Sequence, residues 1–183
     1  PRSGAIRLDG AELAAWSPAQ RALHCGYLPQ GVQLLPGTVS DNIARLASDV
    51  DAAVVTAARR AFCHEMVLAL PEAYDTEVGD GGERLPPGQR QRIALARALF
   101  GQPRFVVLDE PNASLDGEGE QALLAALRAM RSAGVTVIIA GHKPSLMGIC
   151  DRLLVLGNGG VEALGPANEV LNRLGARPPV RAV

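Results

Sequence analysis

The chain has 183 residues, of which 48% are hydrophobic and 20% are charged, and its formal net charge is −1. That length suits one domain with a subdomain. The charge balance gives no support for nucleic-acid binding or for a polybasic contact with a membrane. No apolar run approaches the roughly 20 residues of a membrane-spanning helix, and the first residues lack a signal-peptide pattern. Three widely spaced cysteines lack metal-site spacing and suit a reducing compartment.

The first part of the chain predicts short strands followed by a block of helices. Ser17 and Pro18 supply an N-cap and a proline at the first helical position. Pro71 interrupts a longer helical pattern. Strands are predicted over residues 5–8 and 24–28, and helices over residues 18–23, from residue 41 with Ser40 as N-cap, and over residues 51–70.

The rest of the chain predicts helices alternating with strands, after a glycine-dense loop at residues 76–88. Gly157-Asn158-Gly159-Gly160 is a good hairpin signal. We expect a frayed tail at residues 177–183. Helices are predicted over residues 89–100, 118–131 and 168–174, and strands over residues 105–108, 135–140, 152–156 and 161–164.

Two adjacent carboxylates, Asp109 and Glu110, follow the buried strand pattern at residues 105–108. Strand alternation points them in opposite directions, and Pro111 is expected to hold Glu110 in extended geometry and to end the ladder. Open α/β sheets place ligands at the carboxyl ends of parallel strands. One carboxylate there can hold a magnesium ion while its neighbour orients or deprotonates a water. A strand followed by an acidic turn explains the same residues without a function.

A second polar residue, His142, follows the strand pattern at residues 135–140. A strand with carboxylates, a helix and a strand with a histidine form the alternation of a parallel α/β core. Glu110 and His142 would then lie at the ends of two buried strands. Taken singly, a histidine at a strand end is more often a packing or hydrogen-bonding residue, and Gln30 is more often an exposed loop residue.

The ordered series of motifs resembles the nucleotide-binding domain of an ABC transporter, and within that family the exporters of bacterial type I secretion systems. Asn112 and residues 115–120 resemble the protease-exporting branch. In chain order, the matching segments are the Q-loop at residues 27–30, the exporter segments at 37–43 and 70–80, the signature helix at 88–99, Walker B with the D-loop at 105–116, and the switch histidine His142.

The resemblance implies an α/β fold of the P-loop NTPase-like ABC ATPase type. It implies a parallel-sheet core with a helical subdomain inserted at about residues 40–100. It also implies an N-terminally incomplete domain, because the family places its P-loop upstream of Pro1. We therefore expect that this chain alone neither binds ATP tightly nor hydrolyses it, since the lysine and the backbone cradle for the phosphates are missing.

The resemblance further implies a role for each matching residue in ATP hydrolysis with Mg²⁺. Asp109 would support the magnesium ion through water. Glu110 would act as general base or orient the attacking water. Gln30 would sense the metal and that water and connect the site to the membrane domain, and His142 would donate to the terminal phosphate.

The signature segment and Asp116 are implied to act across a head-to-tail dimer, in which Gly88 and Gln89 meet the nucleotide held by the other copy. Here the signature is Leu85-Pro86-Pro87-Gly88-Gln89, where the family usually has Leu-Ser-Gly-Gly-Gln. The two prolines remove one hydroxyl and two possible amide donors. We hypothesise that this signature supports the partner's ATP site poorly. The alternative is that the prolines only stiffen the loop while Gly88 and Gln89 keep their contacts.

The expected function is that of the ATPase domain of a type I secretion exporter at the cytoplasmic face of the bacterial inner membrane. Its implied partners are a transmembrane domain, a second copy, a periplasmic adaptor, an outer-membrane channel and an exported polypeptide whose identity this domain does not specify. The alternative is a degenerate, non-hydrolysing ABC domain that serves interaction or regulation. Nucleic-acid-handling relatives are disfavoured because the exporter loop is present and coiled-coil heptads are absent.

Overall fold

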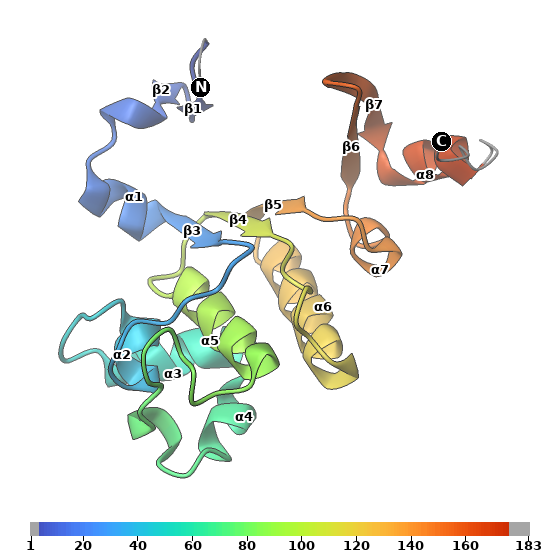
Figure 1. The fold of residues 1–183 in the computed structure, drawn as a ribbon. Coiled ribbons are helices and arrows are strands. Elements are labelled where there is room, and N and C mark those ends of the chain that lie inside the picture. Colours follow the sequence, from blue (N-terminus) through green and yellow to red (C-terminus); the bar gives the residue numbers. More distant parts are fainter. Residues whose placement is uncertain (1–3, 176–183) are drawn as a thin grey trace. The chain divides into compact units, whose positions relative to one another are not determined.

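The computed structural model describes residues 4–175, and these form two compact units that meet in sequence between Ala140 and Gly141. Each unit is described by itself (Figure 1). The predicted tail at residues 177–183 lies outside the described residues. Among the residues that the structure describes, no helix is both long and apolar enough to cross a bilayer.

A three-stranded parallel sheet is the centre of the first unit, as the strand patterns predicted. It contains β3 (Cys25–Leu28), β4 (Phe105–Asp109) and β5 (Thr136–Ala140), in that order across the sheet. Leu28 lies opposite Leu108, and Asp109 lies opposite Ala140. All three strands therefore end at the same edge.

Two helices, α5 (Pro87–Leu99) and α6 (Gly117–Ser132), cover one face of this sheet (Figure 1). Helix α5 packs against β3, and α6, which connects β4 to β5 in the chain, packs against β5. They form because their apolar side chains recur at helical spacing and bury against the strands. On the strands, Leu28, Val106 and Leu108 are fully buried.

The other face of the sheet is largely uncovered. Tyr27, Val107 and Ile138 lie opposite one another in the register, and Tyr27 and Ile138 are 59% and 52% exposed. Because parallel sheets are normally buried on both faces, this row of side chains is an apolar surface that further protein is expected to cover.

The helices before α5 differ from the sequence prediction at two points. Ser40 is not an N-cap, because α2 (Val39–Ala44) begins two residues earlier than predicted, with Thr38 as its N-cap. The Thr38 hydroxyl accepts from the Asp41 N–H at 3.0 Å. The predicted helix over residues 51–70 is two helices, α3 (Asp51–Arg60) and α4 (His64–Leu68). Phe62 between them has a left-handed φ of 52°, which ends α3.

A buried polar residue, Asn42, fixes the loop that leads into α2. Its side chain accepts from the Leu35 N–H at 2.8 Å and donates to the carbonyls of Leu35 and Thr38, each at 2.9 Å. The loop backbone thus obtains the hydrogen bonds that it would otherwise lack. This loop connects β3 to the helical block.

The shorter elements follow their local sequence signals. β1 (Arg7–Leu8) and β2 (Ala11–Glu12) form a hairpin, and η1 (Leu13–Ala15) leads to α1 (Pro18–His24), which Ser17 caps as predicted. η2 (Ala73–Asp75) precedes the glycine-dense loop. The second unit contains α7 (Pro144–Met147), which the sequence analysis missed, the predicted hairpin of β6 (Arg152–Gly157) and β7 (Gly160–Pro166), and α8 (Ala167–Gly175).

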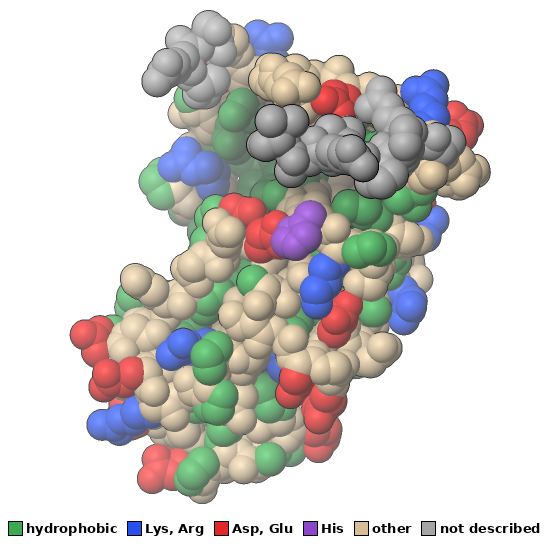
Figure 2. Space-filling model, turned by 45° about the vertical axis from the view of Figure 1, so that its right-hand side comes forward, with side chains coloured by type: hydrophobic (Ala, Val, Ile, Leu, Met, Phe, Trp, Pro, Cys, Tyr) green, Lys and Arg blue, Asp and Glu red, His purple; other side chains and the backbone are tan. Residues whose placement is uncertain are grey.

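Charged side chains of both signs are interspersed with apolar and polar ones over the face shown in Figure 2. That mixture matches the formal net charge of −1. Extended patches of positive charge, which attract nucleic acids or acidic lipids, are not seen among the described residues on that face.

Candidate functional site

The carboxylate pair lies at the carboxyl end of β4. Asp109 is the last residue of the strand, and Glu110 follows with a φ of 45°. The extended geometry expected from Pro111 is therefore wrong. The Glu110 N–H donates to the Ala140 carbonyl at 2.8 Å, so the ladder runs one residue past the strand, and the Ala113 N–H closes a turn onto the Glu110 carbonyl at 3.1 Å. These bonds hold a left-handed conformation that costs roughly 1–2 kcal/mol.

Gln91 on α5 supports the same turn, and the sequence analysis missed it. Its side chain is only 3% exposed, and its Nε2 donates to the Pro111 carbonyl at 3.0 Å and to the Glu110 carbonyl at 3.5 Å. The available signal was a polar residue on the buried face of α5, three and four residues before Ala94 and Leu95.

Gln30 lies at the same edge of the sheet as the carboxylates. It is exposed and follows β3 by two residues, and β3 ends beside β4, with Leu28 opposite Leu108. The first unit thus brings Gln30, Asp109 and Glu110 to one sheet edge. His142 belongs to the second unit, where it is exposed and precedes α7.

The altered signature segment forms the N-terminus of α5. Pro86 is the N-cap and Pro87 the first helical residue, a position where the missing N–H costs the helix nothing. Gly88 and Gln89 therefore keep their N–H groups at the positive end of a 13-residue helix. A Cβ on Gly88 would lie 3.0 Å from the Ser114 carbonyl oxygen, so this helix start packs closely against the D-loop backbone.

The segment after the carboxylates combines a cap with a buried amide. The Asp116 carboxylate accepts from the Gly119 N–H at 2.8 Å and caps α6. Asn112 is 3% exposed, and its Oδ1 has no hydrogen-bond partner among the described residues. Asp116 thus has a structural role, and its side chain remains exposed at the surface.

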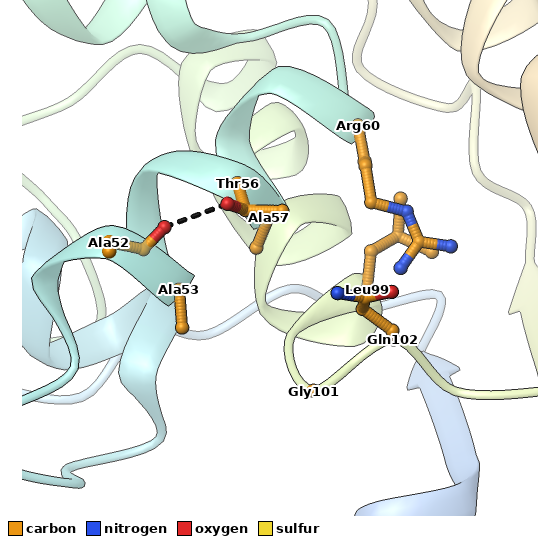
Figure 3. A pocket seen from close by; sticks show the side chains of 8 residues that line it. All are labelled: Ala52, Ala53, Thr56, Ala57, Arg60, Leu99, Gly101 and Gln102. Atoms are coloured by element: carbon orange, nitrogen blue, oxygen red, sulfur yellow. Dashed lines mark hydrogen bonds between the residues drawn. The ribbon is translucent and has the colours of Figure 1, made fainter.

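A separate pocket of about 310 Å³ lies between α3 and the end of α5 (Figure 3). In it the Thr56 hydroxyl donates back to the Ala52 carbonyl at 2.8 Å, and the Nη1 of Arg60 is buried without a partner among the described residues. The predicted site residues do not line it. Its lining residues are Ala52, Ala53, Thr56, Ala57, Arg60, Leu99, Gly101 and Gln102.

The donor set at the sheet edge fits one half of a nucleotide site. A carboxylate and a side-chain amide are oxygen donors of the kind that Mg²⁺ takes while keeping several waters. The free amides at the start of α5 suit a phosphate group. The other half, a glycine-rich loop ending in Lys and Ser or Thr, does not occur in the 183 residues.

Residues 1–113 match the model of the ABC transporter family, and the chain belongs to that family. It has the fold of an ABC exporter ATPase domain: a bacterial Atm1-family ABC exporter with ATP bound superposes with a TM-score of 0.83 at 34% identity, covering 95% of this chain and 30% of that one.

Among curated proteins, the chain is 49% identical over 172 residues to the type I secretion system ATP-binding protein PrsD of Rhizobium meliloti (strain 1021), covering 93% of this chain and 30% of that protein. It is 38% identical to the ATP-dependent lipid A-core flippase of Ralstonia nicotianae, covering 96% and 30%. It is 37% identical to the mitochondrial potassium channel ATP-binding subunit of Mus musculus, covering 96% and 24%. The chain therefore spans less than a third of the length of these relatives.

Proposed function

We propose that this chain is part of the ATPase domain of a type I secretion exporter, which hydrolyses ATP to drive polypeptide export across the bacterial inner membrane. The observation that carries the ATPase assignment is the convergence of Gln30, Asp109 and Glu110 on one sheet edge within an ABC exporter fold. The secretion assignment is supported by the 49% identity to PrsD. The identity is only 38% to the lipid A-core flippase and 37% to the mitochondrial potassium channel ATP-binding subunit.

In the proposed reaction, a bound Mg²⁺ would supply positive charge that screens the phosphates. Asp109 would hold this ion through its water shell, and Gln30 would contact the ion and the attacking water. Glu110 accepts a proton from, or orients, the water that attacks the terminal phosphorus, and the bond from that phosphorus to the bridging oxygen breaks to leave ADP and phosphate. His142 donates a hydrogen bond to the terminal phosphate.

The proposed domain is complete only with a P-loop from outside these 183 residues. The uncovered row of Tyr27, Val107 and Ile138 supports this, because a covering layer is expected there. The whole protein would carry a transmembrane domain and form a head-to-tail homodimer at the cytoplasmic face of the inner membrane. In that dimer Gly88, Gln89 and Asp116 face the nucleotide of the other copy. A periplasmic adaptor and an outer-membrane channel would complete the export path.

The test is ATPase activity and polypeptide export by the full-length protein, with Glu110→Gln as the variant. The amide keeps the size of the side chain and cannot take the proton. We expect turnover to fall at least about 100-fold, since general acid–base catalysis contributes that much, while ATP binding persists. Unchanged turnover in Glu110→Gln would refute the assigned role, and export of lipid without polypeptide would refute the secretion assignment.

A degenerate, non-hydrolysing ABC domain is the second candidate, and the Pro86-Pro87 signature favours it. The double reversion Pro86→Ser, Pro87→Gly in the full-length protein separates the two. If the prolines weaken the partner's site, restoring one charge-assisted hydrogen bond of roughly 1.5–3 kcal/mol raises ATPase turnover about tenfold or more. Equal turnover in both forms would mean that Gly88 and Gln89 suffice.

A further inference from the structure

Arg45 ends α2 and contacts two other helices of the first unit. Its backbone is left-handed, with a φ of 56°. Its guanidinium donates to the Arg97 and Ala98 carbonyls of α5, at 3.1 Å and 3.3 Å. It also donates to the Ala22 carbonyl of α1, at 2.6 Å. One side chain thus joins α1, α2 and the end of α5.

The position of Arg45 has a clear physical reason. The last carbonyls of a helix have no partner within the helix, and the helix dipole places negative charge there. The C-cap residue of α5, Phe100, is extended. The guanidinium of Arg45 supplies donors and positive charge to the final turn of α5 in place of a local cap.

Arg97 extends this connection to the loop that carries Gln30. Its Nη2 donates to the Gln33 carbonyl at 3.0 Å, and Gln33 follows Gln30 by three residues. Burial lowers the pKa of Arg45 and of Arg97, and the charge of Arg45 lowers the pKa of Arg97 further. Neither guanidinium forms an ion pair with a carboxylate among the described residues. Backbone carbonyls therefore balance two close positive charges.

Two site elements consequently depend on one helix. Near its start, Gln91 of α5 donates to the turn that contains Glu110, and near its end Arg97 donates to the loop that follows Gln30. The two side chains are six residues apart, about 9 Å along the helix axis at the usual rise. A shift of α5 along its axis would carry both elements together.

We propose that Arg97, whose backbone carbonyl is held by Arg45, is a positioning residue that keeps the loop of Gln30 in register with the signature helix α5. The inference rests on the proposed ATPase function and extends it. A nucleotide held by a second copy against the start of α5 would then displace the Glu110 turn and the Gln30 loop as one unit. Gln30 would reach its working position only when α5 does.

The experiment is a double-mutant cycle in the full-length protein between Arg97→Lys and Gln30→Ala, with kcat and KM for ATP as readouts. Lysine keeps the charge and loses the planar fork. We expect Arg97→Lys to lower kcat about fivefold with little change in KM, and to change kcat less than about 1.5-fold when Gln30 is already alanine. If Arg97→Lys lowers kcat by the same factor with Gln30 and with alanine at position 30, the proposal is overturned, since a general structural defect would lower kcat in either background.

Hydrogen exchange in the same full-length protein measures directly how well the loop after Gln30 is held. This measurement does not require ATP turnover. We expect Arg97→Lys to speed exchange of amides at residues 31–35 at least about fivefold, as loss of a loop contact does. Arg45→Lys serves as a second variant, with a smaller change of the same sign. The exposed Arg128→Lys on α6 is the matched control, with no change. Unchanged loop exchange in both Arg97→Lys and Arg45→Lys would overturn the proposal, whereas absent ATPase activity in the wild type would overturn only the proposed function.

Discussion

Replacing Gln91 with leucine removes the donor that holds the Glu110 turn and keeps a similar volume. In the folded chain Gln91 is 3% exposed, and the Pro111 carbonyl that it serves at 3.0 Å belongs to a buried residue. Leaving such an acceptor without a partner costs about 1–3 kcal/mol. For a chain of this size that corresponds to a fall in Tm of roughly 2–12 °C.

The assay is thermal and urea unfolding of the chain, with Gln121→Leu on the exposed side of α6 as the matched control. We expect Gln91→Leu to lower the urea midpoint without changing the m-value, while the control stays within about 0.5 kcal/mol of the wild type. In the full-length protein, Gln91→Leu should also lower ATPase turnover. A midpoint for Gln91→Leu equal to that of the control would refute the assignment of Gln91 as the support of this turn.

Two further predictions concern close packing and thiol reactivity. Gly26→Ala should lower the free energy of unfolding by about 1–3 kcal/mol, because a Cβ there collides with the Ala98 carbonyl. Urea denaturation checks this against Gly117→Ala, where no atom lies within 4 Å, and an equal effect of the two would contradict it. Burial raises the pKa of Cys63 to about 12, so at pH 8 iodoacetamide should label the partly exposed Cys25 and leave Cys63 unlabelled in the folded chain. Mass spectrometry reads this, and equal labelling rates would show the reasoning to be wrong.

The sequence predicted the parallel core because its signals are local. The apolar runs at residues 105–108 and 135–140 became β4 and β5, and the helical pattern between them became α6. The cap of α2 was misassigned because Ser40 and Thr38 both carry hydroxyls. Asp41 decides between them, since it completes a reciprocal capping box with Thr38.

The features that the sequence analysis missed depend on contacts between distant residues. The break at Phe62 requires a left-handed residue within a pattern that is otherwise continuously helical. Gln91 and Pro111 are 20 residues apart, and Arg45 and Arg97 are 52 apart, so no local period marks them. The left-handed Glu110 was missed because the preference of a residue before proline for extended geometry is a local rule. It takes no account of the hydrogen bond from the Glu110 N–H to the Ala140 carbonyl of β5.

The uncovered face of the parallel sheet has a consequence for handling this chain in isolation. Tyr27 and Ile138 expose apolar area beside Val107, and β3 and β5 are the outer strands of the described sheet. Two copies can bury these faces against each other or add strands at the edges. The particle size of the isolated chain, measured by light scattering, should therefore increase with protein concentration. Co-expression with the segment that carries the P-loop should keep the particles small, because the same apolar row would then have a partner within its own domain.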